Sequence, residues 1–403
     1  NGEEAVTYLH PLLEPVLSKT LGVPLFQEQL MQMAINVGGF TSTEADELRQ
    51  AMGSKRSQER MERLRGRLYE GMSKRGIDRK VSDQIWEKML AFANYGFPES
   101  HSVSFAHLVY ASSWIKYHYP AAFCAALLNS QPMGFYSPHS LVQDARRHGV
   151  KVLTPNINIS ADKATLETSY DSAGGVAVRL GFSSVRGISA ELAFEIAAAG
   201  PYEDLEQLSR STDVSQKQLE ALATSGAFDC FGIGRREALW AVGATSQSRS
   251  DRLRGIVTGA SAPALPGMSL QDEAIADLWA TGIAPDGHPT RFIRKKLEEE
   301  GVVTATDLLD CELEKVKVAG VVTHRQRPAT ASGTVFVNLE DETGLVNVIV
   351  STGCWLRFRS VVRSESALKV HGRLERHGRV TNVIAEKIER LEIGLTVSSR
   401  DFR

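Results

Sequence analysis

Clustered carboxylates are the residues of this chain with the clearest capacity for metal-dependent chemistry. Glu340, Asp341 and Glu342 stand side by side, and carboxylate oxygens grouped in this way can hold Mg²⁺. The cluster falls at the end of a segment with strand-like alternation, directly before a Thr-Gly turn, so a turn at the rim of a β-barrel is the simpler interpretation. We therefore predict no metal site in this cluster.

The cysteine spacing and the length of the apolar segments argue against a zinc-binding, a disulfide-rich and a membrane-spanning protein. Cys124, Cys230, Cys311 and Cys354 lie far apart, without a Cys-x-x-Cys pair, so neither a cysteine-rich zinc site nor a disulfide framework fits the spacing. Free cysteines are typical of a reducing compartment. No apolar run approaches the ~18–20 residues of a membrane span, and no signal peptide is recognisable. We expect a cytoplasmic protein that does not contact the membrane.

Length and composition predict a globular protein with several domains. The chain has 403 residues, which corresponds to roughly two to four domains at ~150 residues each. Hydrophobic residues make up 42% of it, enough to form real cores. Because 46 Lys and Arg face 48 Asp and Glu, for a net charge of −2, a surface for an anionic partner must be local. The chain starts with Asn1, and we expect it to be a piece of a longer protein.

One stretch is strongly basic. Between Ser54 and Lys80, ten Lys and Arg face four Asp and Glu, a difference of +6. Such a stretch can face phosphate groups. It can also be an ordinary solvated helix face, since Glu59, Glu62 and Arg63 are spaced for ion pairs along a helix. Charge alone leaves both interpretations open.

Residues 1 to about 135 have the pattern of helices. In Leu25–Ala34 the apolar residues recur at intervals of three and four, which predicts a helix with one buried stripe. The stretch Val103–Leu128 is so apolar that we expect a buried pair of helices, interrupted at Tyr119-Pro120.

Residues 175 to 245 read as short helices separated by glycine turns. Gly181–Ile188 predicts a small helix that ends in a tight turn, followed by a helix over Ala190–Ala199. Further along, Leu219–Phe228 leads through a Ser-Gly turn into a helix that begins at Arg235. We predict two tandem helix-hairpin-helix units, because such turns expose backbone N–H groups that can hold phosphates. The alternative is two αα-corners that serve only to pack helices against one another.

From residue 316 onward the hydrophobic period changes from 3.6 to 2, which indicates β-strands. Five strands with a helix between the third and the fourth are the plan of an OB-fold barrel. The segment is basic, with twelve Lys and Arg against seven Asp and Glu over residues 316–390. A linker rich in Ser, Ala and Pro (246–275) and a short helical segment (277–297) precede it. The predicted strands are 316–322, 334–340, 345–350, 367–374 and 380–388, with the helix at 355–362.

In this order, the elements and several motifs resemble the C-terminal part of a bacterial C-family DNA polymerase, the polymerase III alpha subunit. The most specific motifs are Phe26–Ala34, Ala45–Gly53, Phe92–Phe97, Val318–Pro328 and Leu339–Leu345. The resemblance covers essentially the whole chain and implies a multidomain α+β fold. Its parts would be helical fingers (1–140), a tandem helix-hairpin-helix domain (141–245), a linker with a short helical segment (246–300), a C-terminal five-stranded OB-fold barrel (301–395) and a tail (396–403).

Two departures from the replicative pattern point to one branch of this family. Gly96–His101 contains Pro-Glu where replicative members usually have Asn-Lys, and Gln50 stands where they usually have a second Arg. Together with the ending Ser399–Arg403, this is similar to the error-prone, damage-inducible branch, which acts in translesion synthesis and induced mutagenesis. That branch works with accessory proteins related to Y-family polymerases and recombinases. They would link it indirectly to the sliding clamp, because the linker holds no clamp peptide of the Gln-x-x-aliphatic-aromatic type.

The resemblance implies that the fingers close over the incoming deoxynucleoside triphosphate. Arg49, Lys55 and Arg56 match the family's basic positions, and Ser100 and His101 match its second contact loop. A buried core histidine is an equally open interpretation of His101. The Pro-Glu pair removes a cation from this loop, which we expect to loosen nucleotide selection. In this family the Mg²⁺ ions of nucleotidyl transfer are held by carboxylates of an Asp-x-Asp-type strand in the palm. Because this chain contains no Asp-x-Asp pair, the resemblance implies that the fragment has no catalytic residue, holds no metal or cofactor and is inactive alone.

The same resemblance implies two DNA-binding regions, with the hairpins on duplex product and the OB-fold on the single-stranded template. Phe336 alternates with Val335 and Val337 and so faces away from them, either as a stacking platform or as second-layer packing. The hairpin candidates are Arg186, Gly187, Ile188, Lys217, Ser225, Gly226, Ala227, Arg235 and Arg236, and the cationic candidates of the OB-fold are Arg325, Arg327, Arg357, Arg359, Arg373 and Arg376.

A second interpretation is a non-catalytic adaptor that binds nucleic acid or protein through its hairpins and its OB-fold. The fingers favour the polymerase, because an adaptor has no use for a domain that closes over a nucleotide. For the polymerase, the expected partners are primer-template duplex, single-stranded DNA, the incoming nucleotide of the parent and the accessory proteins. The expected location is the bacterial cytoplasm, at the nucleoid.

Overall fold

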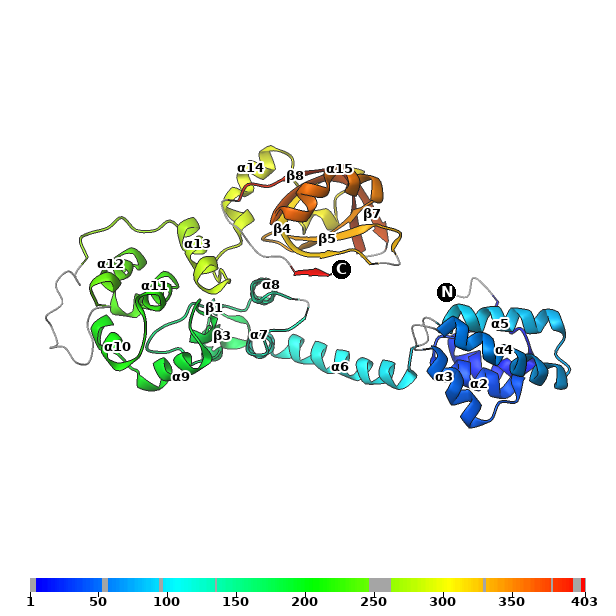
Figure 1. Cartoon of the computed structure of the whole chain (residues 1–403). Helices are drawn as coiled ribbons and strands as arrows, with labels where there is room; N and C mark the ends of the chain where they lie inside the picture. Colours follow the sequence, from blue (N-terminus) through cyan, green and yellow to red (C-terminus); the bar gives the residue numbers. More distant parts are fainter. Residues whose placement is uncertain are drawn as a thin grey trace. The chain divides into compact units, whose positions relative to one another are not determined.

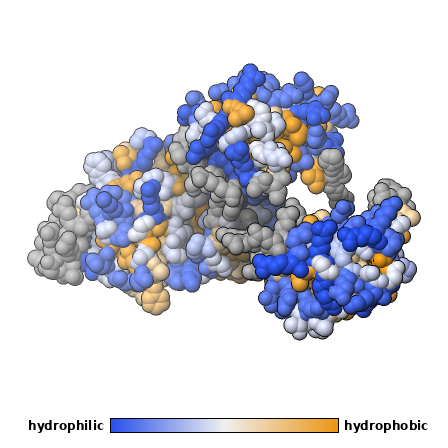
Figure 2. Space-filling model, turned by 45° about the vertical axis from the view of Figure 1, so that its right-hand side comes forward, coloured by the Kyte–Doolittle hydropathy of each residue, from blue (hydrophilic) through white to orange (hydrophobic). Residues whose placement is uncertain are grey.

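The structure of the chain is a computed structural model that divides into two compact units, Asn1–Trp114 and Ile115–Arg403 (Figure 1). It describes residues 5–52, 57–93, 97–134, 136–245, 262–328, 331–377, 380–393 and 400–402. Within these ranges, no helix combines the length and the apolar character needed to cross a membrane. Figure 2 shows one face of the molecule, where hydrophilic residues predominate and apolar residues form small separate groups.

The first unit is helical. Its core brings together apolar side chains from five helices. They include Leu30 and Met33, which confirms the predicted buried stripe of Leu25–Ala34. The elements are η1 (Pro11–Leu13), α1 (Glu14–Leu17), η2 (Ser18–Thr20), α2 (Gln27–Gly38), α3 (Ser42–Met52), α4 (Ser57–Lys74), α5 (Arg79–Ala93) and the start of α6 (Glu99–His118).

Two glycines allow α2 and α4 to cross in direct contact. A Cβ atom on Gly71 would lie 1.6 Å from the carbonyl oxygen of Gly38, so no larger residue fits at Gly71. Arg67 of α4 fixes the crossing, because its guanidinium donates to the carbonyl oxygens of Gly38 and Gly39 and pairs with Glu44 at 2.8 Å. One cation of the basic stretch is therefore structural.

The prediction of a buried pair of helices over Val103–Leu128 is wrong for the first helix. No residue of α6 is buried, although Leu108, Tyr110 and Tyr117 are large. The second helix, α7 (Pro120–Asn129), buries Ala121, Cys124 and Ala125. Composition shows that α6 is apolar, but it does not show whether the chain supplies a surface that covers it.

A small sheet that the sequence pattern does not predict supports the start of the second unit. Strand β3 (Val176–Arg179) pairs in parallel with β1 (Val152–Leu153) and antiparallel with β2 (Thr165–Thr168). Helices α7 and α8 (Pro138–Arg147) share a core with this sheet through Cys124, Val142 and Val178.

The two predicted hairpins follow, with one difference. The first opens with a single 3₁₀ turn, η4 (Phe182–Ser184), instead of a helix, and continues into α9 (Ala190–Ala199), whose N-cap Ser189 accepts from the N–H of Leu192. Then come α10 (Leu205–Ser211), α11 (Gln216–Thr224), η5 (Asp229–Phe231) and α12 (Arg235–Thr245), and after the linker α13 (Leu270–Thr281), η6 (Pro289–Ile293), α14 (Arg294–Glu299) and η7 (Asp307–Leu309).

The barrel confirms the predicted OB plan. Its strands are β4 (Lys315–Gln326), β5 (Val335–Glu340), β6 (Leu345–Val350), β7 (Ala367–His377) and β8 (Val380–Arg390), with α15 (Thr352–Ser364) between β6 and β7. The strand order β5-β6-β8-β7-β4 closes through pairing of β4 with β5. A short strand that the sequence did not indicate, β9 (Arg400–Phe402), runs parallel to β4. The α+β fold class is therefore confirmed.

Candidate nucleic-acid interface

The second hairpin turn is built around Gly226, whose φ of +80° favours glycine. Ser225 and Ala227 on either side are fully buried. The N–H groups of all three residues donate to carbonyl oxygens near the end of α11. These groups are therefore engaged within the protein, and the expectation that they expose N–H donors to a phosphate needs correction. Any contact of this turn with DNA has to use other atoms.

Arg235 is predicted to contact DNA, but its side chain is almost completely buried in the protein. Its Nη1 atom is 2.7 Å from Oδ1 of Asp277 in α13, and the two side chains are only 10% and 5% exposed. The same nitrogen also donates to the carbonyl oxygens of Thr224 and Glu273. Burial raises the pKa of Asp277 to about 7, although Arg235 acts to lower it. The ion pair of Arg235 with Asp277 therefore holds α13 against the hairpin domain. The predicted contact of Arg235 with DNA is wrong.

The first hairpin turn is also in contact with α13. Gly187 has a φ of +78°, and its carbonyl oxygen accepts from Nε2 of Gln218 at 2.9 Å. The backbone N–H of Arg186 donates to the carbonyl oxygen of Ala280 at 2.7 Å. The exposed guanidinium of Arg186 lies over the ring of Trp279, 5.1 Å from its centroid. A contact of this kind leaves one face of the guanidinium available to a ligand.

The remaining hairpin candidates occupy different places. Ile188 is buried in the hairpin core, so it supports the turn and does not contact a ligand. Lys217 is exposed on α11. Arg236 donates to the carbonyl oxygen of Pro266 at 3.0 Å and lies 3.6 Å from a carboxylate oxygen of Asp272. Arg186 and Lys217 are therefore the hairpin cations best placed for a phosphate.

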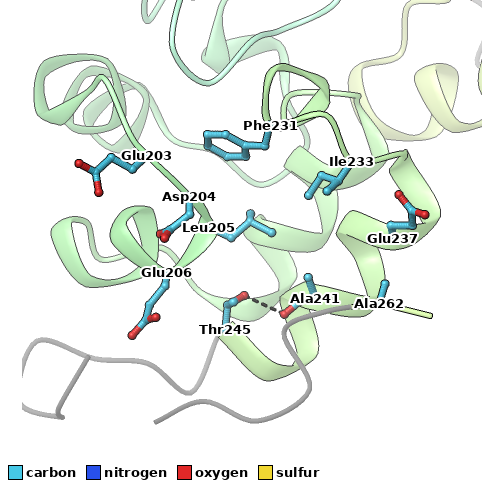
Figure 3. A pocket seen from close by; sticks show the side chains of 10 residues that line it. All are labelled: Glu203, Asp204, Leu205, Glu206, Phe231, Ile233, Glu237, Ala241, Thr245 and Ala262. Atoms are coloured by element: carbon cyan, nitrogen blue, oxygen red, sulfur yellow. Dashed lines mark hydrogen bonds between the residues drawn. The ribbon is translucent and has the colours of Figure 1, made fainter. Parts of the chain in front are cut away.

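Neither of two cavities in the second unit suits a phosphate. One, with a volume of about 510 Å³, lies in the hairpin domain, where Glu203, Asp204, Glu206 and Glu237 surround apolar side chains (Figure 3). Its carboxylates would repel an anion. The other, of about 420 Å³, is mainly apolar and lies beside α7 and α8. Burial raises the pKa of Cys124, which lines it, to about 12, so this thiol is unreactive.

Two of the six OB-fold arginines donate to backbone carbonyl oxygens. Arg325 is buried, and its guanidinium donates to the carbonyl oxygens of Val362, at 2.6 Å, and Glu365, where it closes the C-terminal end of α15. Arg376 donates to the carbonyl oxygens of Leu308 and Cys311. The expectation that Arg325 faces DNA is wrong, because its buried guanidinium is engaged by backbone carbonyls. Arg376 is exposed, and its contact with DNA stays a prediction.

The other four OB-fold arginines are exposed, as Arg376 is. Arg327 lies 5.4 Å from the centroid of the Trp355 ring, and Arg357 lies 5.5 Å from that of Phe358. Arg359 is on the same helix as Arg357, and Arg373 pairs with Glu375 at 2.8 Å. Phe336 lies partly exposed on the outside of the barrel while Val335 and Val337 are buried, so its orientation is the one expected from the alternation. Its role stays a prediction.

The carboxylate cluster forms the junction between the barrel and the segments that precede it. Glu340 is 1% exposed and accepts from Arg147, at 3.1 Å, and from Ser140, at 3.0 Å, both on α8. Burial raises the pKa of Glu340, although Arg147 lowers it. Glu342 pairs with Arg294 and accepts from Thr290. The rim-turn interpretation is thus confirmed, and carboxylates occupied in this way do not suit Mg²⁺.

Two buried histidines lie next to this junction. The rings of His139 and His288 are 5.7 Å apart, and the side chains are 5% and 1% exposed. Burial lowers the pKa of His139 to about 4 and that of His288 well below 6.5, and the positive charges of Arg146 and Arg147 lower both further. Both histidines are therefore neutral at pH 7. No sequence signal separated them from solvated histidines.

The structure describes one of the three basic positions of the fingers that are predicted to contact the nucleotide. Arg49 is exposed and pairs with Asp46 at 2.8 Å, and Lys55 and Arg56 lie outside the described residues. Other cations of the basic stretch form ion pairs along helices, such as Lys74 with Glu70. The solvated-face interpretation therefore holds for part of this stretch.

The second contact loop leads directly into α6. His101 is exposed and lies between the rings of Phe97 and Phe105, with centroid distances of 5.0 and 4.4 Å. A buried core histidine is therefore wrong. Ser100 is exposed as well, and Glu99 beside it pairs with Lys19 at 2.5 Å.

Three family models match separate parts of the chain. They are the bacterial DNA polymerase III alpha subunit finger domain over residues 1–76, a helix-hairpin-helix motif over 149–238 and an OB-fold nucleic acid binding domain over 316–391. An error-prone DNA polymerase from Nocardia farcinica is 55% identical over 100% of this chain. The resemblance to the polymerase III alpha subunit family is confirmed.

Other relatives of this polymerase III alpha-type chain give the same result. The error-prone DNA polymerases of Mycobacterium bovis and of Mycobacterium tuberculosis strain H37Rv are each 53% identical over its whole length. The chain spans 36% to 37% of the length of these three relatives. Among solved structures, asparaginyl-tRNA synthetase from Pyrococcus horikoshii aligns over 22% of the chain with 22% identity and a TM-score of 0.19, a value too low to establish a shared fold.

Proposed function

We propose that this polymerase III alpha-type chain is the nucleotide- and DNA-handling region of an error-prone DNA polymerase that copies damaged templates. The observation that carries the proposal is identity of 53% to 55% along the whole chain to proteins named error-prone DNA polymerase. A finger domain at the start and an OB-fold nucleic acid binding domain near the end fit this role.

In this proposal the parts divide the work. Arg49 and the His101 loop lie beside the incoming nucleotide, the hairpin domain contacts the duplex through Arg186 and Lys217, and the OB-fold contacts the unpaired template. Exposed cations at these places favour the assignment, since phosphate contacts supply most of the affinity for DNA. Catalytic carboxylates and their Mg²⁺ ions belong to the part of the parent polymerase that this chain does not include, so the chain alone does not extend primers.

Contact with other proteins forms the last part of the proposal. Accessory mutagenesis proteins related to Y-family polymerases and recombinases bind the parent polymerase at the nucleoid in the cytoplasm and connect it to the sliding clamp. This rests on the similarity to the error-prone branch. The absence of a clamp peptide in the linker sequence supports an indirect connection.

Primer extension by the full-length parent polymerase tests the function. On a template with one abasic site, the parent with accessory proteins should insert a nucleotide opposite the lesion, and the 403-residue chain alone should not extend any primer. The proposal is wrong if the parent stops at the lesion under all conditions. It is also wrong in part if the isolated chain extends an undamaged primer.

A further inference from the structure

The helix of the OB-fold barrel, α15, carries only positive charge. Its inner side packs on the barrel, where Val362 is buried in the core and Trp355 and Phe358 contact it. The helix contains three arginines and neither Asp nor Glu, and all three arginines are exposed. We call this surface the α15 face and define it by Leu356, Arg357, Arg359 and Arg363.

Other cations of the barrel have carboxylate partners. Arg373 pairs with Glu375 at 2.8 Å, and Arg390 pairs with Glu365, the first acidic residue after α15, at 3.4 Å. Within the described residues, no carboxylate forms an ion pair with an arginine of the α15 face. The positive charge of this face is therefore not compensated by the part of the chain that the structure describes.

An exposed leucine belongs to the same surface. Leu356 directly precedes Arg357, and its side chain is 70% exposed. A phosphate gains nothing from an apolar side chain, whereas a protein partner that buries it gains free energy. Arg359 and Arg363 lie four positions apart on the helix, a spacing at which like charges repel each other. The α15 face therefore suits a ligand that is both acidic and apolar.

The aromatic rings of α15 are already covered. The guanidinium of Arg327 lies 5.4 Å from the centroid of the Trp355 ring, and that of Arg357 lies 5.5 Å from the centroid of the Phe358 ring. Both rings also contact the barrel core. Single-strand binding sites combine cations with aromatic rings on which bases stack. The α15 face offers cations without such rings, so an acidic protein segment fits it better than single-stranded DNA does.

We infer that the α15 face is the docking surface for an accessory protein of the parent polymerase, which binds through a segment rich in Asp and Glu with an apolar anchor side chain. Complementary charge brings such a segment to the arginines and fixes its orientation, and Leu356 supplies the apolar contact. The inference rests on the proposed function and adds the surface and the chemistry by which the partner binds. It departs from the resemblance, which assigns Arg357 and Arg359 to the template.

Fluorescence anisotropy with the 403-residue chain tests the chemistry of this face. The probes are a labelled peptide rich in Glu and Leu, the same peptide with Gln in place of every Glu, and a labelled oligodeoxythymidylate. The wild type should bind the Glu peptide about tenfold more tightly than the Gln peptide. Leu356→Ser should weaken binding of the Glu peptide about fivefold. It should leave binding of oligodeoxythymidylate unchanged, because it removes no charge.

Two matched double variants separate the α15 face from the net charge of the chain. Arg359→Glu with Arg363→Glu should weaken binding of the Glu peptide about tenfold. Lys315→Glu with Lys387→Glu changes the net charge equally at exposed positions of β4 and β8 and should have a much smaller effect. Equal losses in the two double variants would overturn the inference. If Leu356→Ser binds the Glu peptide like the wild type, the face holds phosphates and the inference is also wrong.

Lesion bypass by the full-length parent distinguishes the inference from the function on which it rests. Accessory proteins should stimulate insertion opposite an abasic site by the wild type. Leu356→Ser with Arg363→Glu should lose most of this stimulation, while primer extension on an undamaged template stays the same. Equal stimulation of the variant and the wild type would overturn the docking surface and leave the proposed function intact. A wild type that the accessory proteins do not stimulate would contradict the proposed function and the inference together.

Discussion

Arg235 at the start of α12 and Asp277 in the middle of α13 form a buried ion pair with a distance of 2.7 Å. Together with the contact of Arg186 with Trp279, this pair holds α13 against both hairpin turns. The hairpin domain and α13 therefore form one structure, and its candidate DNA contacts are exposed cations beside α13. The sequence does not show this arrangement, because the two partners are 42 positions apart.

Removal of Asp277 should destabilise the second unit strongly. Asp277→Ala leaves the guanidinium of Arg235 buried without its carboxylate, and the breaking of such pairs costs about 3–5 kcal/mol in free energy of unfolding. Urea unfolding followed by circular dichroism measures the change. Lys151→Ala, which removes an exposed ion pair with Asp171, should leave the midpoint close to that of the wild type. Equal midpoints for Asp277→Ala and Lys151→Ala would show that the buried pair does not fasten α13.

The junction at Glu340 should control how firmly the barrel is attached. Arg147→Ala leaves the Glu340 carboxylate buried without its cation, so we expect amide hydrogen exchange to rise in α8 and in the β5–β6 turn, while β6 inside the barrel stays protected. Glu340→Gln keeps a side chain that can bond to Ser140 and should have a smaller effect. Unchanged exchange at the turn in Arg147→Ala would contradict this role.

The histidine pair predicts loss of stability in acid. An unfolded histidine has a pKa near 6.5, whereas burial lowers the pKa of folded His139 to about 4. Between these values the unfolded chain binds more protons, so the free energy of unfolding falls as the pH drops from 6.5 to 4, by about 3 kcal/mol for His139. Nδ1 of His139 accepts from the backbone N–H of Ala284 at 3.3 Å. His139→Asn, whose amide oxygen can accept the same hydrogen bond, should show a flatter dependence. Urea midpoints at pH 7.5 and pH 5 compare the two proteins, and parallel profiles would rule out His139 as the source.

Glu99 offers a test of nucleotide selection in the full-length parent polymerase. Glu99→Lys restores the cation that replicative members of the family usually have at this position, so misincorporation should decrease severalfold in single-nucleotide insertion kinetics. Lys19→Ala is the matched control, because it removes the ion pair of Glu99 with Lys19 without adding a charge. Should misincorporation by Glu99→Lys equal that of the wild type, the Pro-Glu loop does not set fidelity.

Periodicity in the sequence predicted elements better than it predicted the use of individual side chains. Alternation identified the OB strands and the outward direction of Phe336, since the two faces of a strand alternate strictly along the sequence. It could not show that Arg325 bonds to carbonyls of α15, or that Arg235 meets Asp277, because these partners are brought together only by packing. Nor could it show that Arg325 is buried and Arg327 exposed, since the two residues are only two positions apart in the same basic segment.

Short elements with weak patterns were missed for a related reason. Strands β1 and β2 contain two and four residues, too few for a period to emerge. Cross-strand neighbours on the barrel give no signal in the sequence either. Asn338, Asn347 and Asn382 become neighbours only through the register of three strands.

The salt dependence of DNA binding by the 403-residue chain tests the central claim most directly. Anisotropy titrations with single-stranded, duplex and primer-template DNA should show tightest binding to primer-template. The slope of log affinity against log salt should be roughly −0.7 per single-strand phosphate contact and roughly −0.9 per duplex contact. Arg186→Ala and Lys217→Ala should weaken duplex binding and reduce its slope by about one contact each. Absence of binding to all three DNAs at low salt would contradict the account, because the exposed cations of the hairpins and the barrel would then serve a protein partner.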